Sequence, residues 1–304
     1  MRMKTKDLLT LNELNKNDLL GIINNAIKLK KDLKKGVSKP LLKNKTLAMI
    51  FQKPSTRTRV SFETGMFQLG GHALNLSADE IQLKRGETIE DTAKTLSRYV
   101  DIIMARVYSH EEVEILAKNT TIPVINGLSD SFHPCQILAD LMTIKEKKKR
   151  LAGLKLAWIG DGNNVCNSMI YGCAKTSIDM SIATPKGYEP SKQVVNESKK
   201  HIDLQLLNDP ELAVKDADIV VTDTFVSIHH QSTDRTNDFL PYFQVNSKLM
   251  KKAVPDAIFM HCLPAKRGQE VTAEVIDGSQ SVVWDEAENR LHAQKALMVA
   301  LLRV

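Results

Sequence analysis

Short apolar runs alternate with longer segments of helical spacing along the whole chain. In its first half the predicted strands cover residues 46–51, 72–76, 101–107 and 122–126. In its second half they cover residues 154–160, 180–184, 204–207, 218–223 and 257–262. A repeat of strand, helix and strand is typical of parallel sheets with helices on both faces. The pattern therefore predicts an α/β fold.

Two long helical segments extend this prediction to the organisation of the chain. Residues 134–150 form an amphipathic stretch without an internal breaker, and residues 285–303 have apolar spacing suited to packing on another surface. We therefore expect two Rossmann-like domains, each a parallel sheet flanked by helices, joined by two long helices. The first domain would cover residues 1–148, with 286–304 packing back on it, and the second residues 149–285. Thr88 and Asp91 predict a capping box for a helix that ends near Tyr99.

Composition agrees with a globular protein of two domains. The chain has 304 residues, of which 42% are hydrophobic and 26% charged. The longest apolar run, Ala296 to Leu302, is too short to cross a membrane, and the N-terminus has no secretory pattern. Four cysteines without zinc spacing predict free thiols in a reducing compartment. We expect a cytoplasmic protein that is not associated with a membrane.

The net charge of +6 comes largely from lysine-rich runs at residues 28–35 and 145–150. Such a balance suits either an anionic small molecule or a nucleic acid. Aromatic residues make up only 5%, and the basic runs contain none. No nucleic-acid-binding motif is visible, so the runs are interpreted as solvated surface and no nucleic-acid partner is expected.

The most informative motif is the run from Ser55 to Arg59, which follows a predicted strand and begins a predicted helix. The positive end of the helix dipole and unpaired N–H groups would face a ligand there. Hydroxyl groups and forked guanidinium donors match phosphate oxygens. A helix cap with solvated arginines is the simpler alternative, but five such residues in a row favour an anion site.

Other polar residues also follow predicted strands. Arg57, Arg106 and Arg290 are enough to neutralise a phosphate dianion, although each alone is more often a surface ion-pair partner. His133 and Gln136 stand at a helix start with Pro134 at its first position. Beside an arginine cluster, His133 would donate to a developing oxyanion. Because ligands bind beyond the carboxyl ends of parallel strands, we expect two half-sites across a cleft.

In the second half, the sequence from Gly160 to Asn164 resembles part of a dinucleotide-binding motif. Its third glycine is missing, and the next strand lacks the acid that would hold a ribose, so a nicotinamide-dependent dehydrogenase is disfavoured. Asp223 and Ser227 suit the ammonium and carboxylate groups of a second substrate. Cys262 is either a nucleophile or a buried structural residue, and its sequence leaves both open.

Taken together, these motifs resemble the carbamoyltransferase family, most closely its ornithine branch, over nearly the whole chain. The Ser-Thr-Arg-Thr-Arg turn is shared with the aspartate branch. The ornithine branch is indicated by the combination of Arg106 in Met-Ala-Arg-Val-Tyr, His-Pro-Cys-Gln at 133–136, His-Cys-Leu-Pro-Ala at 261–265 and Glu-Asn-Arg at 288–290.

This resemblance implies a ligand for each half-site. Carbamoyl phosphate would be bound by Ser55, Thr56, Arg57, Thr58, Gln82, Arg106, His133, Gln136, Cys262, Leu263 and Arg290. L-Ornithine would be bound by Asn164, Asp223, Ser227 and Ile228. Gln82 would lie on a loop that reaches a neighbouring subunit, which implies a homotrimer, or a multiple of trimers, with shared active sites.

The implied reaction transfers the carbamoyl group to the side-chain amine of ornithine and yields citrulline and phosphate. Arg57, Arg106, His133 and Cys262 would be the catalytic residues, and no metal or organic cofactor is expected. The alternatives are a carbamoyltransferase for another amine such as putrescine, the dehydrogenase above, and a non-catalytic RNA-binding protein. Ser227-Ile228-His229 departs from the family's Ser-Met-Gly, which bears on the choice of amine.

Overall fold

The computed structural model describes residue 3, residues 5–226 and residues 235–303. The chain forms two compact units. The first contains Met1–Met142 and Asn289–Val304, and the second contains Thr143–Glu288. The polypeptide passes from one unit to the other within α5 (Pro134–Lys148) and α12 (Val283–Leu301).

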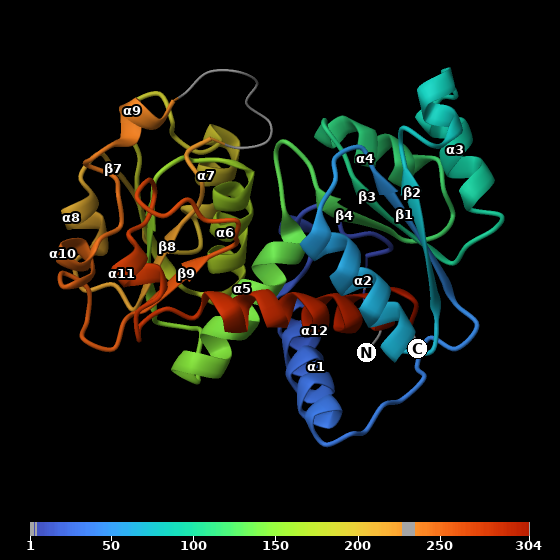
Figure 1. Cartoon of the computed structure of the whole chain (residues 1–304), viewed down its shortest axis with the longest axis horizontal. Coiled ribbons are helices and arrows are strands. Elements are labelled where there is room, and N and C mark those ends of the chain that lie inside the picture. The colour runs from blue at the N-terminus through green and yellow to red at the C-terminus, as the bar shows by residue number, and fades with distance from the viewer. Residues whose placement is uncertain (1–2, 4, 227–234, 304) are drawn as a thin grey trace. The chain divides into compact units, whose positions relative to one another are not determined.

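The first unit is built on a parallel sheet of four strands in the order β2-β1-β3-β4 (Figure 1). Its strands are β1 (Thr46–Phe51), β2 (His72–Ser77), β3 (Ile102–Arg106) and β4 (Val124–Leu128). The other elements of this unit, besides parts of α5 and α12, are η1 (Leu11–Glu13), α1 (Lys16–Lys34), α2 (Thr56–Gln68), η2 (Gln82–Arg85), α3 (Ile89–Leu96) and α4 (His110–Lys118).

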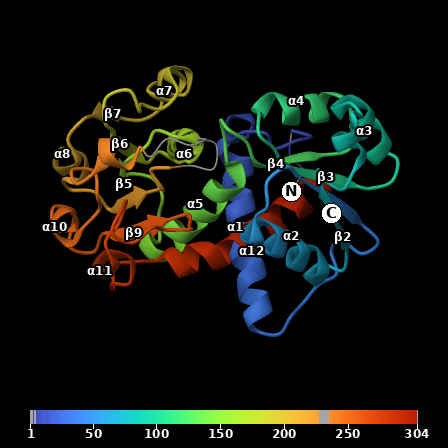
Figure 2. The ribbon, with the colours of Figure 1, turned by 45° about the horizontal axis from the view of Figure 1, so that its top comes forward.

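Right-handed crossovers place α2 on one face of this sheet and α3 and α4 on the other, because the chain leaves β1 and β2 in opposite directions. Ala93 of α3 and Val113 and Leu116 of α4 pack on the second face against Ile50 and Ile103. On the first face α2 lies against α12, as Figure 2 shows. A Cβ atom added to Gly65 of α2 would meet Lys295 Cγ at 3.2 Å.

The second unit has a five-stranded parallel sheet in the order β7-β6-β5-β8-β9. Its strands are β5 (Lys155–Ile159), β6 (Asp179–Ala183), β7 (Leu204–Leu207), β8 (Ile219–Thr222) and β9 (Ile258–His261). Its helices are α6 (Asn164–Thr176), α7 (Lys192–Ser198), α8 (Pro210–Val214), α9 (Thr236–Phe239), α10 (Ser247–Met250) and α11 (Ala273–Ile276). One face carries a core in which Phe225 stacks on Phe239 with ring centroids 4.4 Å apart.

Each sheet has one switch point, where neighbouring strands send their connections to opposite sides. The switch points lie between β1 and β3 and between β5 and β8. In open α/β sheets, ligands bind beyond the carboxyl ends of the strands at such points. The first pair ends at Phe51 and Arg106, and the second at Ile159 and Thr222.

The predicted α/β fold is confirmed. Each of the nine predicted strands is present within about two residues at either end. Thr88 caps α3 by accepting a hydrogen bond from the Asp91 N–H at 3.1 Å, but the return bond of the predicted capping box is not formed and the helix ends at Leu96 instead of near Tyr99. Within the described residues, none of the helices is long and apolar enough to span a membrane.

Candidate active site

The predicted anion site forms the first turn of α2, directly after β1. Ser55 is the N-cap: its Oγ accepts from the Thr58 N–H at 3.3 Å and donates to Thr58 Oγ1 at 3.1 Å. Thr56 and Arg57 are exposed, whereas Thr58 is buried. Ser55 and Thr56 line a pocket of about 710 Å³. The same pocket is also lined by Arg59 and by the acids Glu63, Asp79 and Glu80, so the prediction of an anion site rests on the turn itself and not on this pocket.

A buried hydrogen-bond cluster joins this turn to two distant helices. Arg290 of α12 donates from Nη1 to Gln136 Oε1 at 2.6 Å and from Nη2 to Thr58 Oγ1 at 3.2 Å. Gln136 in turn donates from Nε2 to Asp140 Oδ1 at 2.8 Å. Since the guanidinium fork is planar, its two contacts fix the relative positions of α2, α5 and α12 beside the turn. The structure thus brings together Thr58, Gln136 and Arg290.

Arg106 ends β3, and His133 lies in the loop that follows the neighbouring strand β4. Arg106 is the last residue of β3, and its carbonyl accepts from the Gln52 N–H at 2.9 Å, next to the turn after β1. His133 stands immediately before α5, and its carbonyl accepts from the Gln136 N–H at 3.1 Å. Both side chains are buried. Gln82 begins η2 and is exposed.

The sequence did not single out Lys53, which lies two residues before the anion turn. It is buried, and its Nζ lies 4.2 Å from the centre of the Tyr108 ring. Burial lowers the pKa of Lys53, the charge of Arg106 lowers it further, and Asp130 opposes both effects. Lys53 therefore adds positive charge close to Arg106. A lysine before proline carries no recognisable motif, so only the tertiary structure indicates it.

The second half-site centres on Asp223, which follows β8. Its Oδ1 accepts from the Thr224 N–H at 2.8 Å and from Cys262 Sγ at 3.1 Å. Its Oδ2 accepts from Asn163 Nδ2 at 2.8 Å. Asn163 caps α6, and the buried Asn164 is the first residue of that helix. The structure thus joins Asp223 and Cys262 and adds Asn163, which the family resemblance had not selected.

Asp161, two residues after β5, is a further acid in this region. Burial raises its pKa to about 6, while the neighbouring Arg235 partly opposes the rise. Arg235 Nη2 lies 3.5 Å from Asp161 Oδ1, and its guanidinium stacks over the Tyr188 ring at 4.3 Å. The predicted ornithine-loop residues Ser227 and Ile228, together with the departure at His229, lie outside the described residues.

Asp223, His261 and Cys262 form the single group among the described residues whose ligand atoms could hold a metal ion, because these atoms lie within 4.8 Å of one another. The ring of His261, however, is already engaged. Its Nδ1 accepts from the Leu263 N–H at 2.9 Å, and its Nε2 lies 3.2 Å from Glu270 Oε1. Because a metal would compete with these buried contacts, we assign the imidazole to holding the backbone at Leu263.

The two half-sites have different chemistry. The first combines hydroxyl groups, a helix N-terminus and arginines, which suits a phosphorylated or carboxylated ligand. The second combines a carboxylate, amide groups and a thiol, which suits an ammonium group. The first half-site is therefore suited to an anion and the second to an amine.

Comparison with known proteins agrees with this division. The family model of the aspartate/ornithine carbamoyltransferase carbamoyl-P binding domain matches residues 6–146, and that of the Asp/Orn binding domain matches residues 152–301. The chain is 63% identical to an ornithine carbamoyltransferase of Cenarchaeum symbiosum over 302 residues, covering 99% of each protein. It is 55% identical to that of Pyrococcus horikoshii, covering 99% of this chain and 96% of the relative.

Solved structures give the same result. The ornithine carbamoyltransferase of Pyrococcus furiosus superimposes with a TM-score of 0.92 at 55% identity, covering 96% of this chain and 95% of that one. The enzyme of Thermus thermophilus superimposes with a TM-score of 0.90 at 41% identity, covering 98% and 99%. The chain therefore belongs to the aspartate/ornithine carbamoyltransferase family.

Proposed function

We propose that this protein is an ornithine carbamoyltransferase, which transfers the carbamoyl group of carbamoyl phosphate to the side-chain amine of L-ornithine. The products are L-citrulline and phosphate. The observation that carries this proposal is the near full-length identity with ornithine carbamoyltransferases, combined with the buried Thr58–Gln136–Arg290 cluster beside the anion turn. These relatives give no support to the alternative amine, putrescine.

Carbamoyl phosphate is assigned to the first unit. The phosphate group accepts from the backbone and hydroxyls of residues 55–58 and from Arg57, Arg106 and Arg290. Positive charge and oriented N–H donors stabilise the negative charge that develops on the leaving phosphate. His133 and Gln136 donate to the carbamoyl group, whose oxygen becomes an oxyanion when the carbon is attacked. The clustering of Thr58, Gln136 and Arg290 supports this assignment.

Ornithine is assigned to the second unit. Asp223 accepts from its α-ammonium group, and Asn164, Ser227 and the backbone of Ile228 bind the rest of its amino-acid end. The reacting amine must be uncharged, because its lone pair forms the new bond to the carbamoyl carbon. Cys262, with the backbone at Leu263, orients the reacting groups and forms no covalent intermediate. The 3.1 Å contact from Cys262 Sγ to Asp223 supports this orienting role.

We infer further that the protein is a cytoplasmic homotrimer, or a multiple of trimers, in which Gln82 completes the site of a neighbouring subunit. The exposure of Gln82 at the start of η2 is consistent with such a contact, and the four free cysteines support a reducing compartment. A relative from Pyrococcus furiosus, 54% identical, is named an anabolic ornithine carbamoyltransferase, which favours arginine biosynthesis over a degradative role or a urea cycle.

The function is tested by measuring citrulline and phosphate release with carbamoyl phosphate and either L-ornithine or putrescine. We expect L-ornithine to give the higher kcat/KM, and a preference for putrescine would refute the proposal. Shared sites are tested by mixing two inactive variants, Arg57→Ala and Gln82→Ala, after dissociation and reassembly. Recovered activity is expected only if the two residues serve the same site from different subunits.

A further inference from the structure

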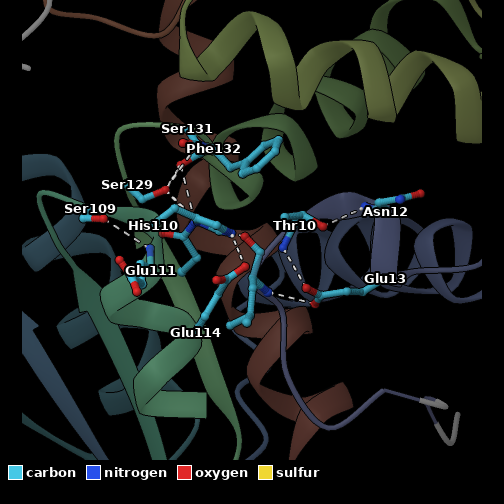
Figure 3. A network of polar contacts seen from close by, with 12 residues as sticks. Thr10, Asn12, Glu13, Ser109, His110, Glu111, Glu114, Ser129, Ser131 and Phe132 are labelled. Carbon is cyan, nitrogen blue, oxygen red and sulfur yellow. Dashed lines mark hydrogen bonds and ion pairs between the residues drawn. The ribbon is translucent and has the colours of Figure 1, made fainter. Parts of the chain in front are cut away.

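His110 lies between the two segments that carry Arg106 and His133. It is the first residue of α4 and follows Arg106 by four positions. Its side chain is 13% exposed, and its Nδ1 lies 2.9 Å from Ser129 Oγ. The ring meets Phe132 edge-on, with centroids 4.9 Å apart. Figure 3 shows these contacts reaching the loop that leads to His133.

A third contact strengthens the same link. The backbone N–H of His110 donates to Asp130 Oδ1 at 2.9 Å, so both the main chain and the ring of His110 hold the loop. The loop itself is tight, because Ser129 N–H donates to the Phe132 carbonyl at 2.9 Å and Phe132 N–H donates to Ser129 Oγ at 3.2 Å. A shift of Ser129 or Phe132 would therefore move His133, the next residue.

The donors around Ser129 decide which tautomer of His110 fits. Ser129 Oγ accepts from the Phe132 N–H at 3.2 Å and from Asn126 Nδ2 at 3.3 Å. A hydroxyl has two acceptor positions and one proton. Of His110 Nδ1 at 2.9 Å and the Phe132 carbonyl at 3.4 Å, the nearer acceptor for its proton is His110 Nδ1. His110 Nδ1 is then an acceptor, and the ring is neutral with its proton on Nε2.

We propose that His110 is a positioning residue for carbamoyl transfer: its neutral ring, through Ser129 and Phe132, fixes the loop that places His133. This inference rests on the proposed role of His133 at the carbamoyl group. His110 makes no contact with substrate and acts through the loop alone.

The link depends on the protonation state of His110. Burial lowers its pKa, whereas the charges of Glu114 on the same helix and Asp130 on the loop raise it. Glu114 Oε1 lies 3.7 Å from His110 Nε2 (Figure 3). The charge of Glu114 also contributes to the raised pKa of Glu13 in η1. Protonation would place a proton on Nδ1 opposite the Ser129 hydroxyl proton. The hydrogen bond from Ser129 to His110 Nδ1 is therefore present above the folded-state pKa of His110 and is lost as pH falls through it, whereas the contacts with Asp130 and Phe132 remain.

Three variants separate this role from simple stability. His110→Phe keeps the edge-on contact with Phe132 but removes the acceptor, and we expect about a tenfold loss of kcat/KM for carbamoyl phosphate, as small displacements of catalytic groups allow. His110→Asn keeps an acceptor near the Nδ1 position and should recover activity to within about threefold of wild type. The activity of His110→Asn should also fall less than that of the wild type when the pH is lowered. Val113→Ala, a buried change on the same helix facing the hydrophobic core, is the matched control and should leave carbamoyl phosphate kinetics unchanged.

A double-mutant cycle with His133→Ala shows whether His110 acts through His133. In the His133→Ala background, His110→Phe should cost less than about twofold in kcat/KM. An equal loss of kcat/KM from His110→Phe in the wild-type and His133→Ala backgrounds would overturn the proposal. The proposal would also be overturned if His133→Ala lowers activity while His110→Phe alone has wild-type kinetics. Normal activity of His133→Ala alone would instead refute the assigned role of His133, and with it this inference. If His110→Phe does not fold, the test is the fall of activity with decreasing pH in His110→Asn compared with the wild type. An identical fall in both enzymes would overturn the proposal.

Discussion

Replacing Gly162 by alanine tests the packing that holds the second half-site. A Cβ atom at this position would lie 2.3 Å from Pro190 N, 2.6 Å from Glu189 C and 2.6 Å from Tyr188 O. All three are backbone atoms, so no side chain can rotate away. The Gly162 N–H also donates to the Tyr188 carbonyl at 2.8 Å, which holds the two segments together. Relief therefore requires one segment to move by about 1 Å to reach ordinary contact.

This displacement should affect both stability and ornithine use. Overpacking typically costs about 1–3 kcal/mol, and a backbone clash predicts the upper end, about 3 kcal/mol of the free energy of unfolding. Asn163 follows Gly162 directly and donates to Asp223, so a shift of about 1 Å reaches the proposed ornithine site. We expect kcat/KM for ornithine to fall by about a hundredfold, while the affinity for carbamoyl phosphate is unchanged.

The measurements are denaturant unfolding, steady-state kinetics with varied ornithine, and equilibrium binding of carbamoyl phosphate. Gly187→Ala is the matched control, because Gly187 has φ +91° but open space where a Cβ would lie. It should cost about 1–2 kcal/mol from backbone strain alone and leave ornithine kinetics near those of the wild type. Wild-type stability and ornithine kinetics in Gly162→Ala would show that the loop absorbs the clash and that this reasoning is wrong.

Three further predictions concern charge. Arg57→Ala should lower kcat by at least about a hundredfold. Arg59→Ala, which removes an exposed ion pair with Glu63, is the control and should change kcat little. Near-normal turnover of a folded Arg57→Ala variant would refute the role of Arg57. Activity at subsaturating ornithine should rise from neutral into alkaline pH, because an amine with an ordinary pKa of about 10.4 must lose its proton, and a flat profile would contradict a limiting deprotonation. Burial raises the pKa of Asp161 from 3.8 to about 6, so its contribution to folding is present below pH 3.8 and is lost as pH rises through 6. Asp161→Asn should remove this fall in unfolding free energy, measured by denaturant titration between those pH values, and an unchanged pH dependence would refute the assignment.

Local patterns were sufficient for the strands and for the helix cap at Ser55. The apolar run at residues 46–51 gives a buried strand, and Ser55 caps the helix that follows. Both depend on interactions between residues a few positions apart, so the sequence carries their signal directly. The same holds for Thr88 at the start of α3.

Local patterns did not predict the contacts between residues that are far apart in the sequence. Arg290 is 154 positions from Gln136 and 232 from Thr58, and nothing in the spacing of the sequence predicts that its fork contacts both. The family resemblance grouped these residues, but the hydrogen bonds among them became visible only in the structure. Asn163 caps α6 through N–H groups two and three positions away, whereas its contact with Asp223 spans 60 positions.

The sequence by itself determined the order of elements and the helix cap at Ser55, whereas anion binding at that cap stays a prediction. Only the tertiary structure decided which side chains meet at the strand ends, including the link from His110 to Ser129, 19 positions away. The physical reason is that periodicity and capping arise from neighbours along one chain segment. Hydrogen bonds between strand ends depend instead on strand order, register and helix packing, which the whole fold sets.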